Sequence, residues 1–171
     1  MHRRRFLTAA GLAGTGVLAG CAGRSTGDAS DTPTDAAAGL RVEPVADGFT
    51  HPWSLAFLPD DGALVTERPG GLSLLDRSTG AVQPVDGVPT VDARGQGGLL
   101  DVALGPAFDE TDLVYLTYAA ANDSGATTTH VGRGRLDREA ARLEAFEALH
   151  AARPFVDSTG HYGSRLAFDA D

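Results

Sequence analysis

The sequence predicts an all-β fold built from the blades of a β-propeller. From residue 40 onward, short apolar runs alternate with turns rich in Gly, Pro and Asp, the pattern of antiparallel strands joined by tight turns. The pattern also repeats, because the apolar triplets at 55–57, 102–104 and 166–168 are offset by 47 and 64 residues. Four-stranded units that recur about every 45 residues are typical of propeller blades.

The first repeat contains four predicted strands. Residues 54–58 form the first strand, the Pro-Asp-Asp-Gly sequence at 59–62 forms a tight turn, and residues 63–67 form the second strand. The third and fourth strands are expected at 71–76 and 81–85, on either side of a Ser-Thr-Gly turn. This order predicts one complete blade.

The second repeat follows the same order. Strands are predicted at 100–104, 113–118 and 130–136. The second offset is longer than the first, which implies an insertion either near 119–129 or near 157–163.

The outer strand of the second blade, at 138–152, has a competing interpretation. The segment is rich in helix formers, and Leu143, Phe146 and Leu149 lie at helical spacing, which favours a helix. The blade order instead requires a strand, with Leu143 and every second residue after it on one side. The repeat favours the strand.

A third repeat opens at 164–169, and the sequence stops at Asp171. Two blades and the start of a third cannot close a ring, and an open ring exposes sheet edges. We therefore expect residues 40–171 to form a partial propeller domain, and the chain to be an N-terminal fragment of a longer protein.

The charge of the chain excludes some partners. Its formal net charge is −9, it contains no lysine, and without residues 1–20 it keeps eleven arginines against 23 acidic residues, a charge of −12. Such a surface argues against binding to nucleic acid or to anionic lipid. It suits a saline environment, where salt screens self-repulsion, and so a halophilic source. A GC-rich genome that prefers Arg to Lys is the alternative.

The N-terminus predicts an export signal at residues 1–21. Three arginines at 3–5 precede Phe-Leu and an apolar stretch at 8–19, which is too short to span a membrane. Paired arginines before a weakly hydrophobic, Gly-rich stretch are typical of twin-arginine signals. The sequence Leu-Ala-Gly-Cys that ends at Cys21 matches a lipoprotein box, so we expect a lipid on Cys21; an ordinary signal with a chance cysteine is the alternative.

Residues 22–39 contain no large apolar residue, so they cannot bury enough surface to fold and are expected to form a disordered linker. Because Cys21 is the only cysteine, the chain has no internal disulfide. The predicted localisation is outside the cell, with a lipid anchor in the outer face of the cytoplasmic membrane.

Two loops carry candidate site residues, because each precedes the first strand of a repeat. In a propeller that strand lines the central channel, and the loops that enter it lie at the channel mouth, where ligands bind. Gln96 lies among glycines in the first loop and offers both a donor and an acceptor; the alternative is a connecting turn that needs positive φ. His161 lies in the second loop and can act as a general base near neutral pH; the alternative is a histidine that is bonded to backbone.

Four segments resemble a known family. The sequences HPWSLAFLPD at 51–60, VTERPG at 65–70, GQGGLLDVAL at 95–104 and GHYGSRLAFD at 160–169 are similar to blocks of the soluble PQQ-dependent aldose, glucose and sorbosone dehydrogenases. The resemblance covers residues 40–171. It implies a six-bladed β-propeller and an oxidoreductase that oxidises aldose sugars at the anomeric carbon, with PQQ as hydride acceptor and Ca²⁺ as a second cofactor.

The resemblance also implies roles for single residues. His161 matches the catalytic base, and Gln96 matches a residue beside the sugar and the cofactor. The glucose-specific branch has an acid before the base, where this chain has Gly160, which argues against strict glucose preference. The main PQQ-binding residues and the Ca²⁺ ligands of the family lie beyond Asp171, so no metal site is assigned here and the fragment itself is expected to be inactive. Arg165 matches no functional residue and is interpreted as structural.

Other residues receive structural interpretations, and other functions stay open. His51 and Trp53 are expected to pack at the start of a blade, and Glu67 and Arg68 are interpreted as an exposed pair rather than as contacts at the channel rim. The electron acceptor is either membrane-bound or soluble. The alternative function is a non-catalytic cell-surface propeller that binds glycan or protein. A propeller lactonase would need metal-binding acids on several inner strands, and none is evident in this sequence.

Overall fold

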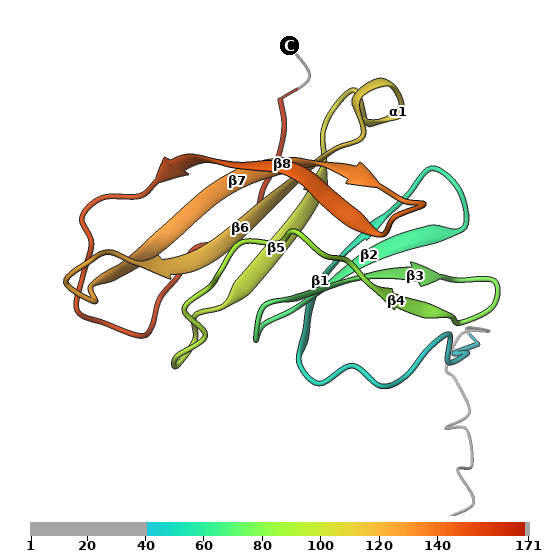
Figure 1. The fold of residues 1–171 in the computed structure, drawn as a ribbon. Helices are drawn as coiled ribbons and strands as arrows, with labels where there is room; N and C mark the ends of the chain where they lie inside the picture. Colours follow the sequence, from blue (N-terminus) through green and yellow to red (C-terminus); the bar gives the residue numbers. More distant parts are fainter. Residues whose placement is uncertain (1–40, 170–171) are drawn as a thin grey trace, which may run out of the picture. The chain divides into compact units, whose positions relative to one another are not determined.

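Two four-stranded antiparallel sheets make up the folded part of the chain (Figure 1). The computed structural model describes residues 41–169, so the predicted signal at 1–21 with Cys21 and the predicted linker at 22–39 lie outside the described residues. The first sheet has the order β1 (Pro52–Phe57), β2 (Gly62–Glu67), β3 (Gly71–Asp76) and β4 (Val82–Pro84). The second has the order β5 (Leu99–Leu104), β6 (Leu113–Ala121), β7 (Thr127–Asp137) and β8 (Arg142–Ala151).

Each sheet is a simple meander, in which every strand pairs with its neighbours in sequence, and this is the topology of a propeller blade. All four strands predicted for the first repeat are present, and the three inner strands of the second repeat are present and longer than predicted. The predicted all-β propeller fold is therefore confirmed. One short helix, α1 (Phe108–Thr111), lies between β5 and β6, and no helix among residues 41–169 has the length and apolar character that crossing a membrane requires.

The outer strand β8 resolves the ambiguity at 138–152 in favour of a strand. Helix formers extend here because β8 pairs with β7 along almost its whole length, so tertiary pairing overrides local propensity. The predicted alternation after Leu143 is wrong, however. Ala145 has φ 48° and one more residue lies on β8 than on β7 between the pairs Arg135↔Glu144 and Arg133↔Glu147. This bulge turns Phe146 toward the core and leaves Glu147 exposed.

The extra residues of the second repeat extend a hairpin. β6 and β7 continue their pairing to Ala119↔Thr129 and Ala121↔Thr127, beyond the length of the corresponding strands in the first sheet. One of the two predicted positions for the insertion, 119–129, is therefore confirmed. The turn is closed by Asn122, whose Oδ1 accepts hydrogen bonds from the backbone N–H groups of Ser124 and Ala126.

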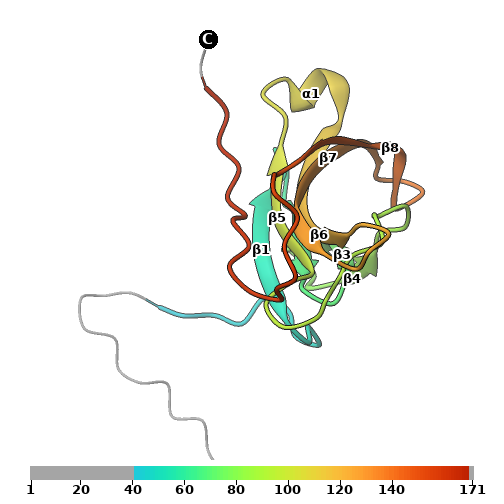
Figure 2. The ribbon, with the colours of Figure 1, turned by 90° about the vertical axis from the view of Figure 1, so that its left-hand side faces the viewer.

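The third repeat does not form a strand in this structure. Residues 164–169 are extended and run beside β5, as Figure 2 shows for the segment that returns from β8, but no strand is assigned there. Side-chain contacts hold the segment in place of the backbone hydrogen bonds of paired strands. The hydroxyl of Thr117 donates to the Ser164 carbonyl at 2.8 Å, and the Tyr115 and Phe168 rings meet edge to face with centroids 5.0 Å apart. The segment therefore lies where the innermost strand of the next blade is expected, and residues 41–169 contain no further strand of that blade.

One apolar core lies between the two sheets. It contains buried side chains from both, which are completely or almost completely inaccessible to solvent: Leu58, Leu64, Leu72, Val85, Leu99, Val102, Val114, Leu116, Leu136 and Leu143. The opposite face of β2 is covered by residues 46–49. Burial on both faces explains why nearly every residue of β2 is inaccessible.

β1 presents an apolar side to solvent. Trp53, Leu55 and Phe57 alternate along it and are 51%, 43% and 62% exposed. The expectation that Trp53 packs at the start of the blade is wrong in this structure, and His51 is exposed as well. β1 is also an edge strand, because only β2 pairs with it among residues 41–169.

A repeated hydrogen bond joins consecutive repeats. In the first sheet the hydroxyl of Thr66 donates to the Leu100 carbonyl at 2.6 Å, and in the second the hydroxyl of Thr117 donates to the Ser164 carbonyl. Asp101, only 2% exposed, bonds in both directions: its carboxylate accepts from the Ser54 hydroxyl at 2.6 Å and from the Leu166 backbone N–H at 2.7 Å.

Ser54, Asp101 and Arg165 occupy the same register position in successive repeats, since each precedes one of the repeated apolar triplets. The Arg165 guanidinium lies 3.3 Å from the Asp101 carboxylate. The Arg165 side chain is exposed, whereas that of Asp101 is buried. The structural interpretation of Arg165 is consistent with this contact. The three residues form a polar connection from one innermost segment to the next.

Candidate functional site

The loop between β4 and β5 carries Gln96, and its glycines are required by its shape. Gly95 has φ 56° and Gly98 has φ 138°, values that side-chain-bearing residues rarely adopt. A Cβ on Gly97 would lie 2.3 Å from the Asp92 carbonyl oxygen. The loop is therefore a connecting turn between blades that needs positive φ, as the alternative interpretation of Gln96 predicts. It also presents the Gln96 side chain at the surface.

Gln96 and His161 are brought together from positions 65 residues apart. The Gln96 Oε1 accepts a hydrogen bond from the His161 backbone N–H at 2.8 Å, and the Gln96 backbone N–H donates to the Thr159 carbonyl, also at 2.8 Å. Two bonds in opposite directions thus join the two loops. The orientation of the amide follows from this contact, since only the oxygen can accept from an N–H. The sequence predicts both residues at one rim, and the structure places them in contact.

His161 has a left-handed backbone conformation, with φ 65°. This conformation is costly for most residues and is maintained here by the hydrogen bond that the His161 backbone N–H donates to the Gln96 Oε1. The imidazole is exposed and makes no side-chain hydrogen bond among residues 41–169. The histidine is therefore bonded to its surroundings through its backbone, while its ring remains free to meet a ligand.

A cavity of about 430 Å³ lies beside His161, between its loop and the start of β7. Its wall includes Tyr162 and Thr127, whose hydroxyl oxygens are 2.6 Å apart and both lie within hydrogen-bond distance of the Ser158 carbonyl. These contacts hold residues 158–162 against β7. The cavity combines hydroxyl groups with apolar side chains, which suits a small polar ligand.

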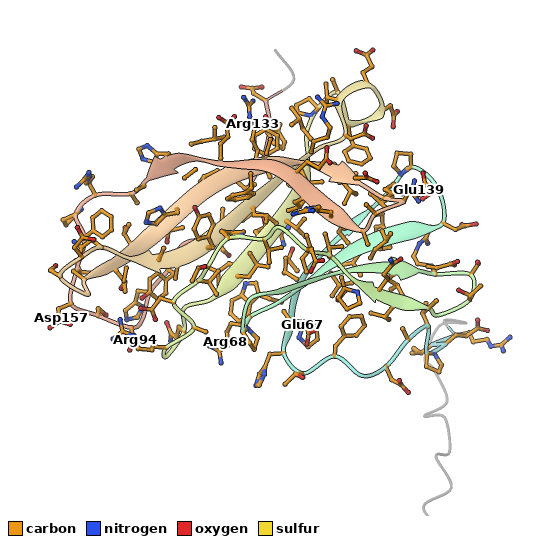
Figure 3. All side chains as sticks on the ribbon, viewed as in Figure 1. Glu67, Arg68, Arg94, Arg133, Glu139 and Asp157 are labelled. Atoms are coloured by element: carbon orange, nitrogen blue, oxygen red, sulfur yellow. The ribbon has the colours of Figure 1, made fainter. Side chains whose placement is uncertain are left out.

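Glu67 and Arg68 do not form the exposed pair that the sequence suggested. The Glu67 carboxylate accepts from the backbone N–H of Thr50 at 2.5 Å. The Arg68 Nη1 lies 2.9–3.0 Å from the carbonyl oxygens of three residues in the Gln96 loop. Figure 3 shows Glu67, Arg68, Arg94 and Asp157 along one edge of the molecule, the edge formed by these loops. Both side chains instead bind backbone groups of other segments, Glu67 at Thr50 and Arg68 in the Gln96 loop.

Arg94 lies in the same loop and has a different partner. Its guanidinium donates to both carboxylate oxygens of Asp92, and these hydrogen bonds lower the pKa of Asp92 and raise that of Arg94. A second histidine lies away from the loops: burial, reinforced by the charge of His150, lowers the pKa of His130, which stacks on Tyr118. His130 therefore stays neutral near pH 7, and its ring serves packing.

Comparisons with known proteins point to one family. The family model for glucose / sorbosone dehydrogenase matches residues 49–171. The aldose sugar dehydrogenase YliI of Escherichia coli is 42% identical over 135 residues, which are 78% of this chain and 36% of that protein. The chain thus spans about a third of the length of the curated relatives it matches.

Solved structures show the same likeness. A crystal structure of glucose dehydrogenase is 45% identical with a TM-score of 0.73, over 77% of this chain and 38% of that one. The PQQ-bound form of an aldose sugar dehydrogenase from Streptomyces coelicolor is 29% identical with a TM-score of 0.60, over 66% and 34% of the two chains. With a family model that matches most of its length and structures that share its two blades, the chain belongs to the glucose / sorbosone dehydrogenase family.

Proposed function

We propose that the protein is a quinoprotein that oxidises aldose sugars at the anomeric carbon, with PQQ as hydride acceptor and His161 as general base. The observation that carries this proposal is the contact between Gln96 and His161, which fixes the backbone of the histidine and leaves its imidazole exposed. The names of the relatives, an aldose sugar dehydrogenase and a PQQ-bound enzyme of the same kind, support the substrate class and the cofactor.

The chemistry assigned to this chain is proton transfer and orientation. A neutral imidazole at His161 accepts the proton of the anomeric hydroxyl, so that the C1–H bond can break, the hydrogen leaves with its electron pair as hydride, and the sugar becomes a lactone. Bound PQQ supplies the electron-pair acceptor for that hydride. Because the Gln96 Oε1 is engaged by His161, its Nε2 remains available to donate to a sugar hydroxyl or to the cofactor.

The residues present fit one side of such a site. His161 and Gln96 supply a base and an amide donor at one rim, and Gly160 places no charge beside the base where a carboxylate would. We place the remaining PQQ contacts and the Ca²⁺ ligands outside residues 41–169, among which no three His, Cys, Asp or Glu side chains are grouped as metal ligands would be. The 171-residue chain alone is therefore expected to be inactive.

Reconstitution tests the proposed function. The protein made from its complete open reading frame, loaded with PQQ and Ca²⁺, should reduce an artificial dye when aldoses are added. A methyl glycoside of the same sugar has no free anomeric hydroxyl for His161 to deprotonate, so it should give no reduction. A protein that binds PQQ and reduces no dye with any of several aldoses would favour the alternative function, a non-catalytic propeller that binds glycan or protein.

We also propose that the protein is exported and held by lipid on Cys21, with residues 22–39 as a tether. This position would keep the enzyme within reach of a membrane or soluble electron acceptor. Since one acyl chain anchors a protein only marginally, stable anchoring requires the diacylglycerol that a lipoprotein box directs. Cys21→Ser should move the protein from the membrane fraction to the soluble fraction without changing its activity; retention of the variant on the membrane would overturn the proposal.

A further inference from the structure

The Arg68 side chain binds three carbonyl groups of the Gln96 loop. Arg68 directly follows β2, and its Nη1 lies 3.0 Å from the Ala93 carbonyl oxygen, 2.9 Å from that of Gly95 and 3.0 Å from that of Gly97. Carbonyl groups that converge on one point repel one another unless a cation or several donors lie between them. The Arg68 guanidinium meets this need because its delocalised positive charge and the two N–H bonds of Nη1 lie among the three oxygens.

The backbone of Arg68 holds the other end of the same loop. The Leu99 backbone N–H donates to the Arg68 carbonyl at 3.0 Å, and the approach at Gly98 is so close that a Cβ there would lie 1.9 Å from the Arg68 carbonyl oxygen. The loop is thus fixed at its start by the side chain and at its end by the main chain of one residue. Gln96 lies between these two points.

The opposite side of the loop holds the loop of the base. Gln96 donates its backbone N–H to Thr159 and accepts the backbone N–H of His161 on its side chain. Arg68 and His161 share no hydrogen bond, so any effect of Arg68 on the base passes through Gln96 and its loop. Arg94, which lies in that loop, is bonded to Asp92 and is more exposed, so it does not replace Arg68.

We propose that Arg68 is a positioning residue for the base of the sugar-oxidising site, acting through the Gln96 loop. The inference rests on the proposed function of His161, but the ordering of the two loops is measurable without it. Loss of the guanidinium leaves three converging carbonyl groups without their donor, so the loop shifts and Gln96 no longer holds the His161 N–H in place.

Amide hydrogen exchange tests the ordering directly, in the protein made from the complete open reading frame. Arg68→Met should speed the exchange of the Gln96 and His161 amides by at least about 10-fold, because charge-assisted hydrogen bonds that fix the loop are lost. The matched control is Arg77→Met. Arg77 belongs to the same sheet and bonds the Asp60 carbonyl and the Asp61 carboxylate, far along the chain from both loops, so its loss should leave these two amides unchanged.

Kinetics test the effect on the base. Arg68→Met should lower kcat on the order of 100-fold with little change in KM, since misplacing a reacting group by about 1 Å has an effect of this size. Arg68→Lys, which restores a cation without the planar fork, should recover part of the loss and serves as the test if Arg68→Met does not fold. Arg77→Met should keep the wild-type kcat.

The outcomes separate the two proposals. If the wild-type protein oxidises no aldose, the proposed function fails, and the exchange measurement still decides whether Arg68 orders the two loops. Wild-type exchange at Gln96 and His161 in a folded Arg68→Met protein would overturn the inference. A wild-type kcat in Arg68→Met or in Arg68→Lys, together with faster exchange, would show that loop order does not matter to the base and would overturn it as well.

Discussion

Replacing His161 with asparagine is expected to lower kcat for aldose oxidation by about 10²–10⁴-fold, the usual contribution of a general base. Asparagine is the informative replacement because it tolerates the left-handed conformation that His161 adopts at φ 65°. Its backbone N–H can still donate to the Gln96 Oε1. The substitution therefore removes the base and leaves the loop in place. Dye reduction with saturating sugar measures the loss.

The melting temperature is the control for this variant. It should equal that of the wild type, because the exposed imidazole makes no hydrogen bond within residues 41–169 that the substitution would break. The substitution should lower the affinity for PQQ by a smaller factor than it lowers kcat. A variant with wild-type kcat would show that His161 does not accept the proton, and the proposed mechanism would have to be abandoned.

Gly98→Ala is expected to produce the largest loss of stability, at least about 3 kcal/mol in the free energy of unfolding. Two effects combine at this position. The backbone has φ 138°, a region that is essentially restricted to glycine, and the new Cβ would lie 1.9 Å from the Arg68 carbonyl oxygen. Because that contact is to backbone, it cannot be relieved by a side-chain rotation. Denaturant unfolding of the two proteins measures the difference.

Gly125→Ala is the matched control for Gly98→Ala. Gly125 also has positive φ, at 81°, but a Cβ there meets nothing within 4 Å. Its substitution should cost about 1–2 kcal/mol from backbone strain alone. The difference between the two variants isolates the close approach of the Gln96 loop to Arg68. Equal losses for the two substitutions would mean that this approach is looser than the structure indicates.

Most of the fold could be predicted from the sequence, because it depends on local patterns. The tight turn at 59–62 and the alternating apolar runs predict where the inner strands lie, and the repeat predicts their order. The exact alternation in β8 could not be predicted, since it depends on a bulge at Ala145 that opposes a particular stretch of β7. The state of residues 164–169 depends on partner strands that are absent from residues 41–169, so a local pattern alone overpredicts a strand there.

The two loops of the site could be predicted from the sequence, but the contacts that their residues make could not. Glycines around Gln96 and His161 are visible in the sequence, and so is their place before an inner strand. The contacts of Arg68 leave no such signal. Its partners are backbone carbonyl groups 25–29 residues away, and carbonyl groups are present in every residue. Its position directly after a strand and beside Glu67 instead suggests an ordinary exposed pair.

The central claim, that the protein oxidises aldoses at the anomeric carbon, is tested most directly by reduction of the bound quinone in a single turnover. The PQQ-loaded and Ca²⁺-loaded protein, made from the complete open reading frame, is mixed without oxygen or dye with an aldose that carries deuterium at C1. The absorbance of the quinone should change to that of its reduced form, and more slowly than with the unlabelled sugar, because the C1–H bond breaks in that step. No reduction by any aldose, in a protein shown to hold PQQ, would contradict the proposed function.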